Sequence, residues 1–248
     1  MSKRRRLIVG NWKMYGRLTS SLTLAGDLAE KAVASKPLDF DMVICPPSPL
    51  IWPVAEAVMG TPVLVGGQDC HTATHGAYTG DVSAAMFADL GCRYVIVGHS
   101  ERRIGHGEPD ELIARKAAAV QLAGLTAILC VGETAGDRAA DNTADAIARQ
   151  LRASMPEKCT MAHLVIAYEP VWAIGSGQQP TPEEISDVHR VIREVLGPAG
   201  EAVQILYGGS VSPHNAGPIL DEVEVDGVLV GSASISSDAF WAIAEKAR

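Results

Sequence analysis

Short apolar runs alternate with longer amphipathic stretches along nearly the whole chain. Each run is almost continuously hydrophobic, as expected for parallel strands that are covered on both faces rather than half exposed. The runs are Leu7–Val9, Met42–Cys45, Val63–Val65, Tyr94–Val97, Ala127–Val131, Leu164–Tyr168, Val203–Leu206 and Val228–Val230. The pattern therefore predicts eight buried strands.

The stretches between these runs carry helix signals. Thr181, Pro182 and Glu184 supply an N-cap, a proline at the first helical position and the glutamate of a capping box. A helix is therefore expected over Ile185–Leu196. The other predicted helices are Ser20–Ala34, Pro49–Met59, Asp110–Ala123, Thr143–Arg152 and Asp238–Ala247.

The alternation of strands and helices predicts the architecture. No linker or low-complexity tract interrupts it, and 248 residues is an ordinary length for one α/β barrel. We therefore expect an α/β protein with a single (β/α)8 barrel over residues 1–248. An open doubly wound sheet is the alternative. Its GxGxxG fingerprint is missing after the first strand, where the chain reads Gly10-Asn11-Trp12-Lys13.

Composition and charge restrict the partners. A hydrophobic content of 47% with 5% aromatic residues indicates an aliphatic core. A net charge of −8 argues against nucleic-acid binding, and the basic run from Lys3 to Arg6 is expected to be a solvated segment before the first strand. No apolar stretch is long enough to span a membrane. We expect a soluble, cytoplasmic protein with neither nucleic acid nor membrane as partner.

The cysteines predict neither disulfides nor a metal site. They are five in number and dispersed, which favours reduced and buried thiols: Cys45, Cys70, Cys92, Cys130 and Cys159. Cys70 and His71, with His75 nearby, lack the further ligands that would complete a metal site. No metal and no cofactor are predicted.

Polar residues follow the predicted strands at their carboxyl ends, where barrels carry their chemistry. They are Asn11 and Lys13 after the first strand, Gly98-His99-Ser100-Glu101 after the fourth, Glu169 after the sixth, Tyr207-Gly208-Gly209-Ser210 after the seventh and Gly231-Ser232 after the eighth. A lysine, a histidine and a glutamate are thus expected at one mouth of the barrel. The glycine-rich turns can present backbone N–H groups to a phosphate, assisted by a short helix that begins near Ser232.

Several segments make the pattern specific. The chain resembles the triosephosphate isomerase family in these segments, in the same order: GNWKM (10–14), YTGD (78–81), GHSERR (98–103), AYEPVWAIGSG (167–177), YGGSV (207–211) and LVGSAS (229–234). The resemblance implies a (β/α)8 barrel that interconverts D-glyceraldehyde 3-phosphate and dihydroxyacetone phosphate in glycolysis and gluconeogenesis. It implies an enediolate intermediate and no cofactor.

The resemblance also implies roles for the residues at the strand ends. Glu169 is expected to move the proton between the two carbons, and His99 to polarise the carbonyl oxygens as a neutral imidazole, because a helix that begins behind it disfavours the charged ring. Lys13 is expected to supply fixed positive charge, with Glu101 orienting it. The substrate-binding residues are then Asn11, Lys13, Gly175, Ser210, Gly231 and Ser232, and the supporting residues are Glu101, Ser100, Tyr207 and Thr79.

Two loops follow from the same resemblance. The segment from Pro170 to Gln179 is expected to be a lid that excludes water from the reacting substrate. The loop from His71 to Thr79 is expected to reach into a second copy of the chain, with Thr79 near the partner's active site. A homodimer is therefore predicted.

Some positions depart from the family pattern, and three other functions remain open. Tyr15 stands where asparagine is usual and Ser232 where glycine is usual; Asp81, Ser176 and Pro109 are milder changes. An isomerase of the same mechanism could act on a four-carbon ketose phosphate. A serine hydrolase lacks its GxSxG turn here. A catalytically silent barrel would be expected to have lost Lys13, His99 or Glu169.

Overall fold

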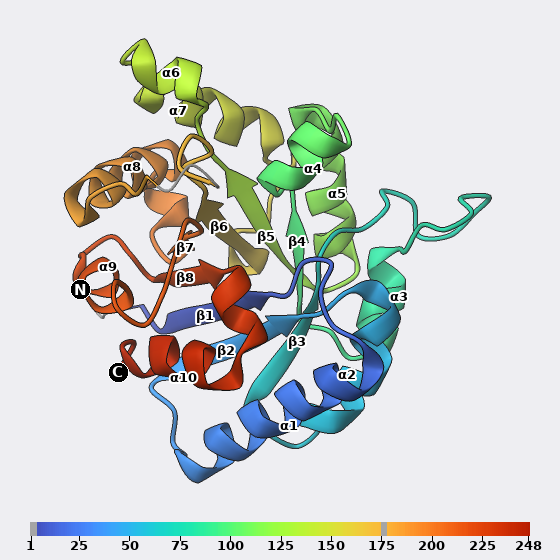
Figure 1. The fold of residues 1–248 in the computed structure, drawn as a ribbon. Helices are drawn as coiled ribbons and strands as arrows, with labels where there is room; N and C mark the ends of the chain where they lie inside the picture. The colour runs from blue at the N-terminus through green and yellow to red at the C-terminus, as the bar shows by residue number, and fades with distance from the viewer. Residues whose placement is uncertain (1–3, 175–177) are drawn as a thin grey trace.

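The strands close into a barrel. A computed structural model describes residues 4–174 and 178–248, and in it eight parallel strands pair in chain order, with β8 returning to β1 (Figure 1). The strands are β1 Arg6–Asn11, β2 Phe40–Cys45, β3 Val63–Gly67, β4 Tyr94–Val97, β5 Thr126–Val131, β6 Leu164–Tyr168, β7 Gln204–Tyr207 and β8 Gly227–Val230. The predicted barrel is confirmed, and each predicted strand overlaps an observed one.

Helices surround the barrel (Figure 1). They are α1 Leu18–Ala34, α2 Ile51–Val58, α3 Ala84–Asp89, α4 Ser100–Gly105, α5 Asp110–Leu122, α6 Ala135–Ala139, α7 Thr143–Ser154, α8 Pro182–Leu196, α9 Ala216–Asp221 and α10 Ser237–Glu245. Short 3₁₀ turns cover Ser48–Leu50, Met161–His163, Pro198–Gly200 and Ser232–Ile235. Within the described residues, no helix is both long enough and apolar enough to cross a membrane.

The six helices predicted by range are all present, α4 was expected only as a helix that begins behind His99, and three other short helices were missed. α8 begins at the predicted capping box, in which Thr181 accepts a hydrogen bond from the Glu184 N–H. The missed helices are α3, α6 and α9, which have six, five and six residues. Such short helices contain fewer than two turns, so no apolar periodicity can develop in them.

The core has two layers, which explains the continuous hydrophobicity of the strands. Leu7 and Val9 of β1 pack inside the barrel with residues such as Ile128 and Leu206. Ile8 lies between them in the chain and packs in the larger cluster that includes the helices. Alternate residues of each strand are therefore buried on opposite faces. All five cysteines are free thiols; Cys159 is half-buried and the others are buried.

The loop between β3 and α3 extends away from the barrel (Figure 1). Residues 74–81 on it are exposed. The ring of Tyr78 packs against that of His71 with 4.0 Å between the ring centroids. At its base, the N–H of His71 donates to the carbonyl of Val82 at 2.8 Å. The loop is thus closed at its base while its tip points into solvent.

His189 of α8 connects the helical layer to β6. Its ring is fully buried and packs edge-on against Tyr168, the residue before Glu169. Nδ1 lies 2.9 Å from the Glu224 carbonyl, so it carries the proton, and Nε2 has no hydrogen-bond partner. Burial lowers the pKa of His189 to about 4, against a small opposing effect of that hydrogen bond.

This histidine is expected to make the fold sensitive to acid. The unfolded chain binds a proton at His189 near pH 6.5 and the folded chain only near pH 4, so stability falls as the pH drops through this window. The loss amounts to about 3 kcal/mol when complete. Urea unfolding of the parent and of His189→Gln between pH 7 and pH 4 measures it. As the pH falls, the parent's free energy of unfolding should decrease more steeply than that of His189→Gln, and the difference in slope should correspond to the uptake of about one proton on unfolding. Equal slopes would show that His189 does not cause the sensitivity to acid.

Candidate active site

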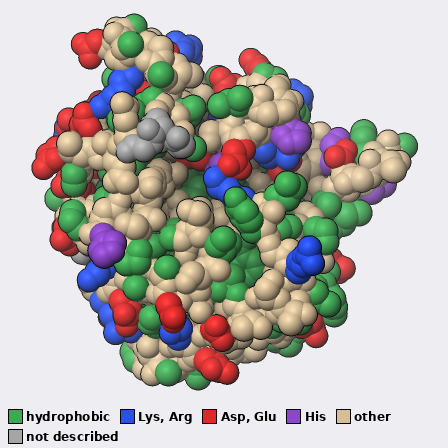
Figure 2. Space-filling view, viewed as in Figure 1, with side chains coloured by type: hydrophobic (Ala, Val, Ile, Leu, Met, Phe, Trp, Pro, Cys, Tyr) green, Lys and Arg blue, Asp and Glu red, His purple; other side chains and the backbone are tan. Residues whose placement is uncertain are grey.

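The carboxyl ends of the strands surround a cavity of about 300 Å³. The face in Figure 2 is hollowed near its centre, where basic and acidic side chains meet. The cavity is lined by Asn11, Lys13, Tyr15, His99, Glu169, Ile174, Gly208, Gly209, Ser210, Val211, Leu229, Gly231 and Ser232. Residues from strands β1, β4, β6, β7 and β8, or from the turns after them, therefore meet at one site.

Glu169 follows β6 and is 1% exposed. Its Oε2 accepts a hydrogen bond from the Ser100 N–H at 2.9 Å, and its Oε1 accepts one from the Ser100 hydroxyl at 3.2 Å. The Nε2 of His99 lies 2.9 Å from the same Oε1. The backbone is also held, because the Glu169 N–H donates to the Val131 carbonyl at 2.8 Å. A buried carboxylate with this many donors is stable in its ionised form.

His99 is placed by the start of α4. It is the N-cap residue, and its Nδ1 accepts a hydrogen bond from the Glu101 N–H at 3.2 Å. An N–H that points at Nδ1 requires a lone pair there, so the ring proton belongs on Nε2, which faces Glu169. The ring therefore carries its proton on Nε2, and this N–H points towards the Glu169 carboxylate.

The two side chains change each other's titration. Burial raises the pKa of Glu169, but the charge and hydrogen bond of His99 and the two hydrogen bonds from Ser100 lower it by more, so the net direction is downward. Burial lowers the pKa of His99, but Glu169 raises it more. This upward direction is opposite to the one predicted from the helix start alone. The sequence did not reveal that the carboxylate would contact the ring.

Lys13 lies at the rim of the cavity. Its Nζ is 2.6 Å from the Glu101 carboxylate, and its own φ of +49° is unusual for a residue with a side chain. The Lys13 N–H donates to the Asn11 side chain at 3.0 Å, and its carbonyl accepts from the Gln68 side chain at 2.8 Å. Both backbone polar groups of this strained residue are therefore satisfied.

The glycine-rich turns after β7 and β8 form a further part of the cavity wall. A Cβ on Gly208 would lie 3.0 Å from the Glu169 side chain, and one on Gly231 would lie 3.3 Å from Lys13. The turn after β7 is held by Asn215, which donates to the Ser210 carbonyl at 2.9 Å. Ser232 begins the predicted short helix, which is a 3₁₀ turn over Ser232–Ile235. The missing side chains leave backbone N–H groups accessible to an anion.

The segment after Glu169 is anchored by an aromatic residue. The indole N–H of Trp172 donates to Glu133 at 2.7 Å, and the Tyr168 hydroxyl donates to the same carboxylate oxygen at 3.0 Å. The Arg138 guanidinium stacks on the Trp172 ring at 4.1 Å. Gly175, Ser176 and Gly177, on which the predicted lid and one phosphate contact depend, lie outside the described residues.

Most of the predicted site residues lie at this cavity. Asn11, Lys13, His99, Glu169, Ser210, Gly231 and Ser232 line it, and Ser100 and Glu101 contact residues that do. The buried Tyr207 lies beneath Gly209, where an added Cβ would be 2.1 Å from its hydroxyl. Thr79 is exposed on the extended loop and does not line the cavity of its own chain.

Sequence reasoning missed other residues of the site. Ile174, Val211 and Leu229 line the cavity, and Gln68 and Glu133 support it through the hydrogen bonds given above. All three apolar residues were quoted within motifs, but apolar side chains carry no chemical signal of their own. Gln68 follows β3, so the rule that chemistry lies at strand ends could have found it.

No metal site accompanies these groups in the described part of the chain. Within residues 4–174 and 178–248, no three His, Cys, Asp or Glu side chains are arranged to hold a metal ion. Asp69 and Glu108, which lie close together, instead bind the Lys116 ammonium at 2.7 and 2.6 Å.

A closed parallel barrel with a buried carboxylate, an imidazole, a lysine and glycine-rich turns at its carboxyl end defines a barrel enzyme that acts on small anionic substrates. The family model described as triosephosphate isomerase matches residues 6–247. The chain therefore belongs to the triosephosphate isomerase family.

Individual relatives agree with this assignment. The triosephosphate isomerase of Afipia carboxidovorans is 51% identical over 98% of this chain and 98% of its own length. That of Xanthobacter autotrophicus is 47% identical over 98% and 97%. The crystal structure of triosephosphate isomerase from Bartonella henselae superposes with a TM-score of 0.89 at 37% identity, and 98% of each chain is covered.

Proposed function

We propose that this chain interconverts D-glyceraldehyde 3-phosphate and dihydroxyacetone phosphate, with Glu169 as the base that transfers a proton between adjacent carbons. The observation that carries the proposal is the contact between Glu169 and His99, 2.9 Å apart at the floor of a cavity with Lys13 at its rim. A base, a proton donor and a fixed positive charge are the groups that an enediolate intermediate requires.

Proton abstraction requires Glu169 to exchange its partners. In the free enzyme its two oxygens accept from Ser100 and His99. To reach a substrate carbon, at least one of these hydrogen bonds must break. Because the charge and hydrogen bond of Glu169 are the largest effects that raise the pKa of His99, the departure of Glu169 lowers that pKa, although the Glu101 charge still opposes burial. This shift favours the neutral imidazole, which donates Nε2–H to one substrate oxygen and then takes a proton back from the hydroxyl on the neighbouring carbon, so that the ring ends in its starting form.

Lys13 and the glycine-rich turns have complementary roles in the proposal. The Lys13 ammonium stabilises negative charge on the substrate oxygens, and Glu101, 2.6 Å away, directs it. The backbone N–H groups around Ser210, Gly231 and Ser232 bind the phosphate without requiring a basic surface, which fits a net charge of −8. Asn11 is proposed to contact both Lys13 and substrate.

Substrate turnover tests the reaction. Purified protein in the presence of a chelator should interconvert the two triose phosphates, measured by coupled dehydrogenase assays in both directions. A tetrulose phosphate, tested in parallel, addresses the four-carbon alternative, which the relatives do not favour. Faster turnover of the four-carbon sugar, or turnover only after metal is restored, would contradict the proposal.

A homodimer is proposed on the basis of exposed apolar side chains near the extended loop. Met14 is 94% exposed, Ile104 72% and Tyr78 48%. A second cavity of about 400 Å³ adjoins the first and shares Asn11, Lys13 and His99 with it. It could accept the loop of a second copy, which would place Thr79 near the partner's site. Sedimentation velocity should therefore give a particle mass that is twice the 26.1 kDa of one chain. A cytoplasmic location is proposed with the function.

A further inference from the structure

One arginine behind the cavity joins the two strands on which the acid–base pair depends. Arg103 belongs to α4, and its side chain is 13% exposed. Its Nε donates to the Gly98 carbonyl at 2.8 Å, and its Nη2 donates to the Cys130 carbonyl at 3.0 Å. A single planar guanidinium therefore connects the end of β4 to the end of β5.

The first of these carbonyls lies directly before His99. Gly98 has a φ of +69°, and this turn takes the chain out of β4 into the start of α4. A Cβ at Gly98 would meet Ile113 at 2.8 Å and the Arg103 Nη2 at 3.2 Å. The peptide plane between Gly98 and His99 is thus held from behind by the arginine, and the His99 ring emerges from it towards Glu169.

The second carbonyl is one residue from the anchor of Glu169. Val131 follows Cys130 in β5, and its carbonyl accepts the N–H of Glu169 at 2.8 Å. The guanidinium therefore bonds to the same stretch of β5 that holds the backbone of the proposed base. The separation between the His99 ring and the Glu169 carboxylate depends on both attachments.

Arg103 is itself held in one orientation. Its Nη1 pairs with the Asp110 carboxylate at the start of α5, and its Nη2 also donates to the Ser154 hydroxyl at 3.0 Å. Ser154 is fully buried and donates to Asp110 at 2.9 Å. The fork of the guanidinium is directed at both carbonyls in a way that the single ammonium of lysine cannot reproduce.

We propose that Arg103 is a positioning residue for proton transfer, one that sets the geometry between His99 and Glu169 without touching substrate. This inference rests on the proposed function of the cavity. Misplacement of reacting groups by about 1 Å costs on the order of a hundredfold in rate. Arg103 should accordingly affect kcat much more than KM.

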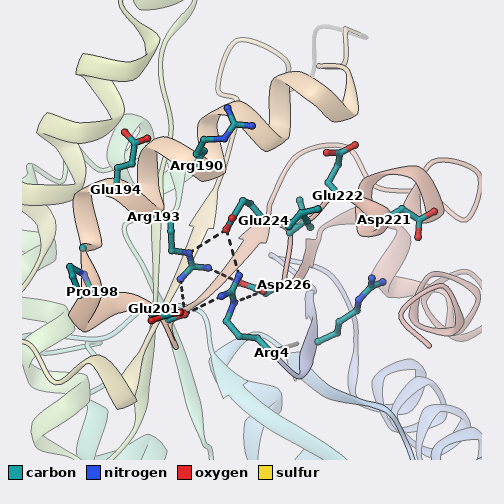
Figure 3. A pocket seen from close by; sticks show the side chains of 14 residues that line it. Arg4, Arg190, Arg193, Glu194, Pro198, Glu201, Asp221, Glu222, Glu224 and Asp226 are labelled. Carbon is teal, nitrogen blue, oxygen red and sulfur yellow. Dashed lines mark hydrogen bonds and ion pairs between the residues drawn. The ribbon is translucent and has the colours of Figure 1, made fainter. Parts of the chain in front are cut away.

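The barrel offers a matched control at its other end. Arg193 is 15% exposed and donates to the carbonyls of Gly200 and Val203 at 2.8 and 2.7 Å. Its Nη2 pairs with Asp226 at 2.9 Å (Figure 3). These partners precede β7 and β8, so the cluster lies at the amino ends of the strands, whereas the catalytic cavity lies at their carboxyl ends. Arg103 and Arg193 are thus both largely buried, and each binds two backbone carbonyls and a carboxylate. They differ in the end of the barrel at which they lie.

The test compares Arg103→Lys with Arg193→Lys. Both variants keep the charge, and both should lose similar thermal stability. At a temperature at which circular dichroism shows each to be folded, Arg103→Lys should lose at least tenfold in kcat with KM within threefold of the parent, whereas Arg193→Lys should retain its kcat. Arg103→Met should lose more kcat than Arg103→Lys. Asp110→Asn provides a milder change, with an intermediate loss, if Arg103→Met does not fold.

A second measurement does not depend on turnover. The imidazole ¹⁵N resonances of His99, identified by their loss in His99→Gln, should shift in Arg103→Lys and remain unchanged in Arg193→Lys. Parent-like kcat together with unchanged His99 resonances in Arg103→Lys would overturn the proposal. If the parent failed to isomerise trioses, the proposed function would fall. The resonances alone would then decide whether Arg103 positions His99.

Discussion

Replacing Glu169 by glutamine is expected to lower kcat by about a thousandfold or more, since a positioned general base contributes up to about four orders of magnitude. Glutamine has the shape of glutamate, and its amide oxygen can still accept from His99 and the Ser100 hydroxyl in the buried site, although its NH2 group cannot accept from the Ser100 N–H. It cannot remove a proton from carbon. The loss therefore corresponds to about 4 kcal/mol of transition-state stabilisation, with little change in folding.

Binding and a control variant separate this loss from disruption of the site. The phosphate is proposed to bind at the turns after β7 and β8. The binding of inorganic phosphate, measured by calorimetry or as protection against thermal unfolding, should therefore persist in Glu169→Gln. Glu224→Gln removes a carboxylate that pairs with Arg4 and Arg193 at the other end of the barrel, and it should keep parent kcat. Substantial isomerase activity in Glu169→Gln would exclude this residue as the base.

The fold could be predicted because its strands are buried on both faces. Leu7, Ile8 and Val9 are all at 0% exposure, although neighbours in the strand face opposite layers. Such runs are visible in one sequence without any knowledge of pairing. Among the short helices that were missed, α6 shows the opposite situation. α6 buries none of its residues, so it leaves no apolar stripe to recognise.

The site was predictable only as far as position along the strand determines it. His99 and Glu169 stand at strand ends, and closing the barrel brings strand ends together. Contacts between distant residues were not predictable. Arg103 belongs to a quoted motif, yet its bonds to Cys130 and Ser154 join residues 27 and 51 positions apart. The direction of the His99 pKa was predicted wrongly for the same reason, because the decisive neighbour is Glu169, 70 positions later.

Replacing Lys13 by methionine is expected to reduce kcat/KM by about a thousandfold, because the variant loses a charge that acts on both binding and the developing negative charge. Methionine retains much of the length that packs beside Gly231, and Asn11 and Gln68 can still hold the backbone of residue 13. Glu101 would lose its 2.6 Å partner and leave an uncompensated carboxylate near the substrate. That negative charge should repel phosphate and raise KM further.

The control and the salt dependence distinguish this role from general loss of charge. Lys31 pairs with Asp238 at 3.0 Å on the surface, and Lys31→Met should keep parent kcat/KM. The double variant Lys13→Met with Glu101→Gln should recover part of the KM increase, because it removes the repelling carboxylate. Steady-state kinetics at several ionic strengths measure both effects, since the parent's KM should rise with salt more than that of Lys13→Met. Equal salt dependence in the two proteins would show that Lys13 does not attract the anion, and the phosphate would then be bound by the backbone turns alone.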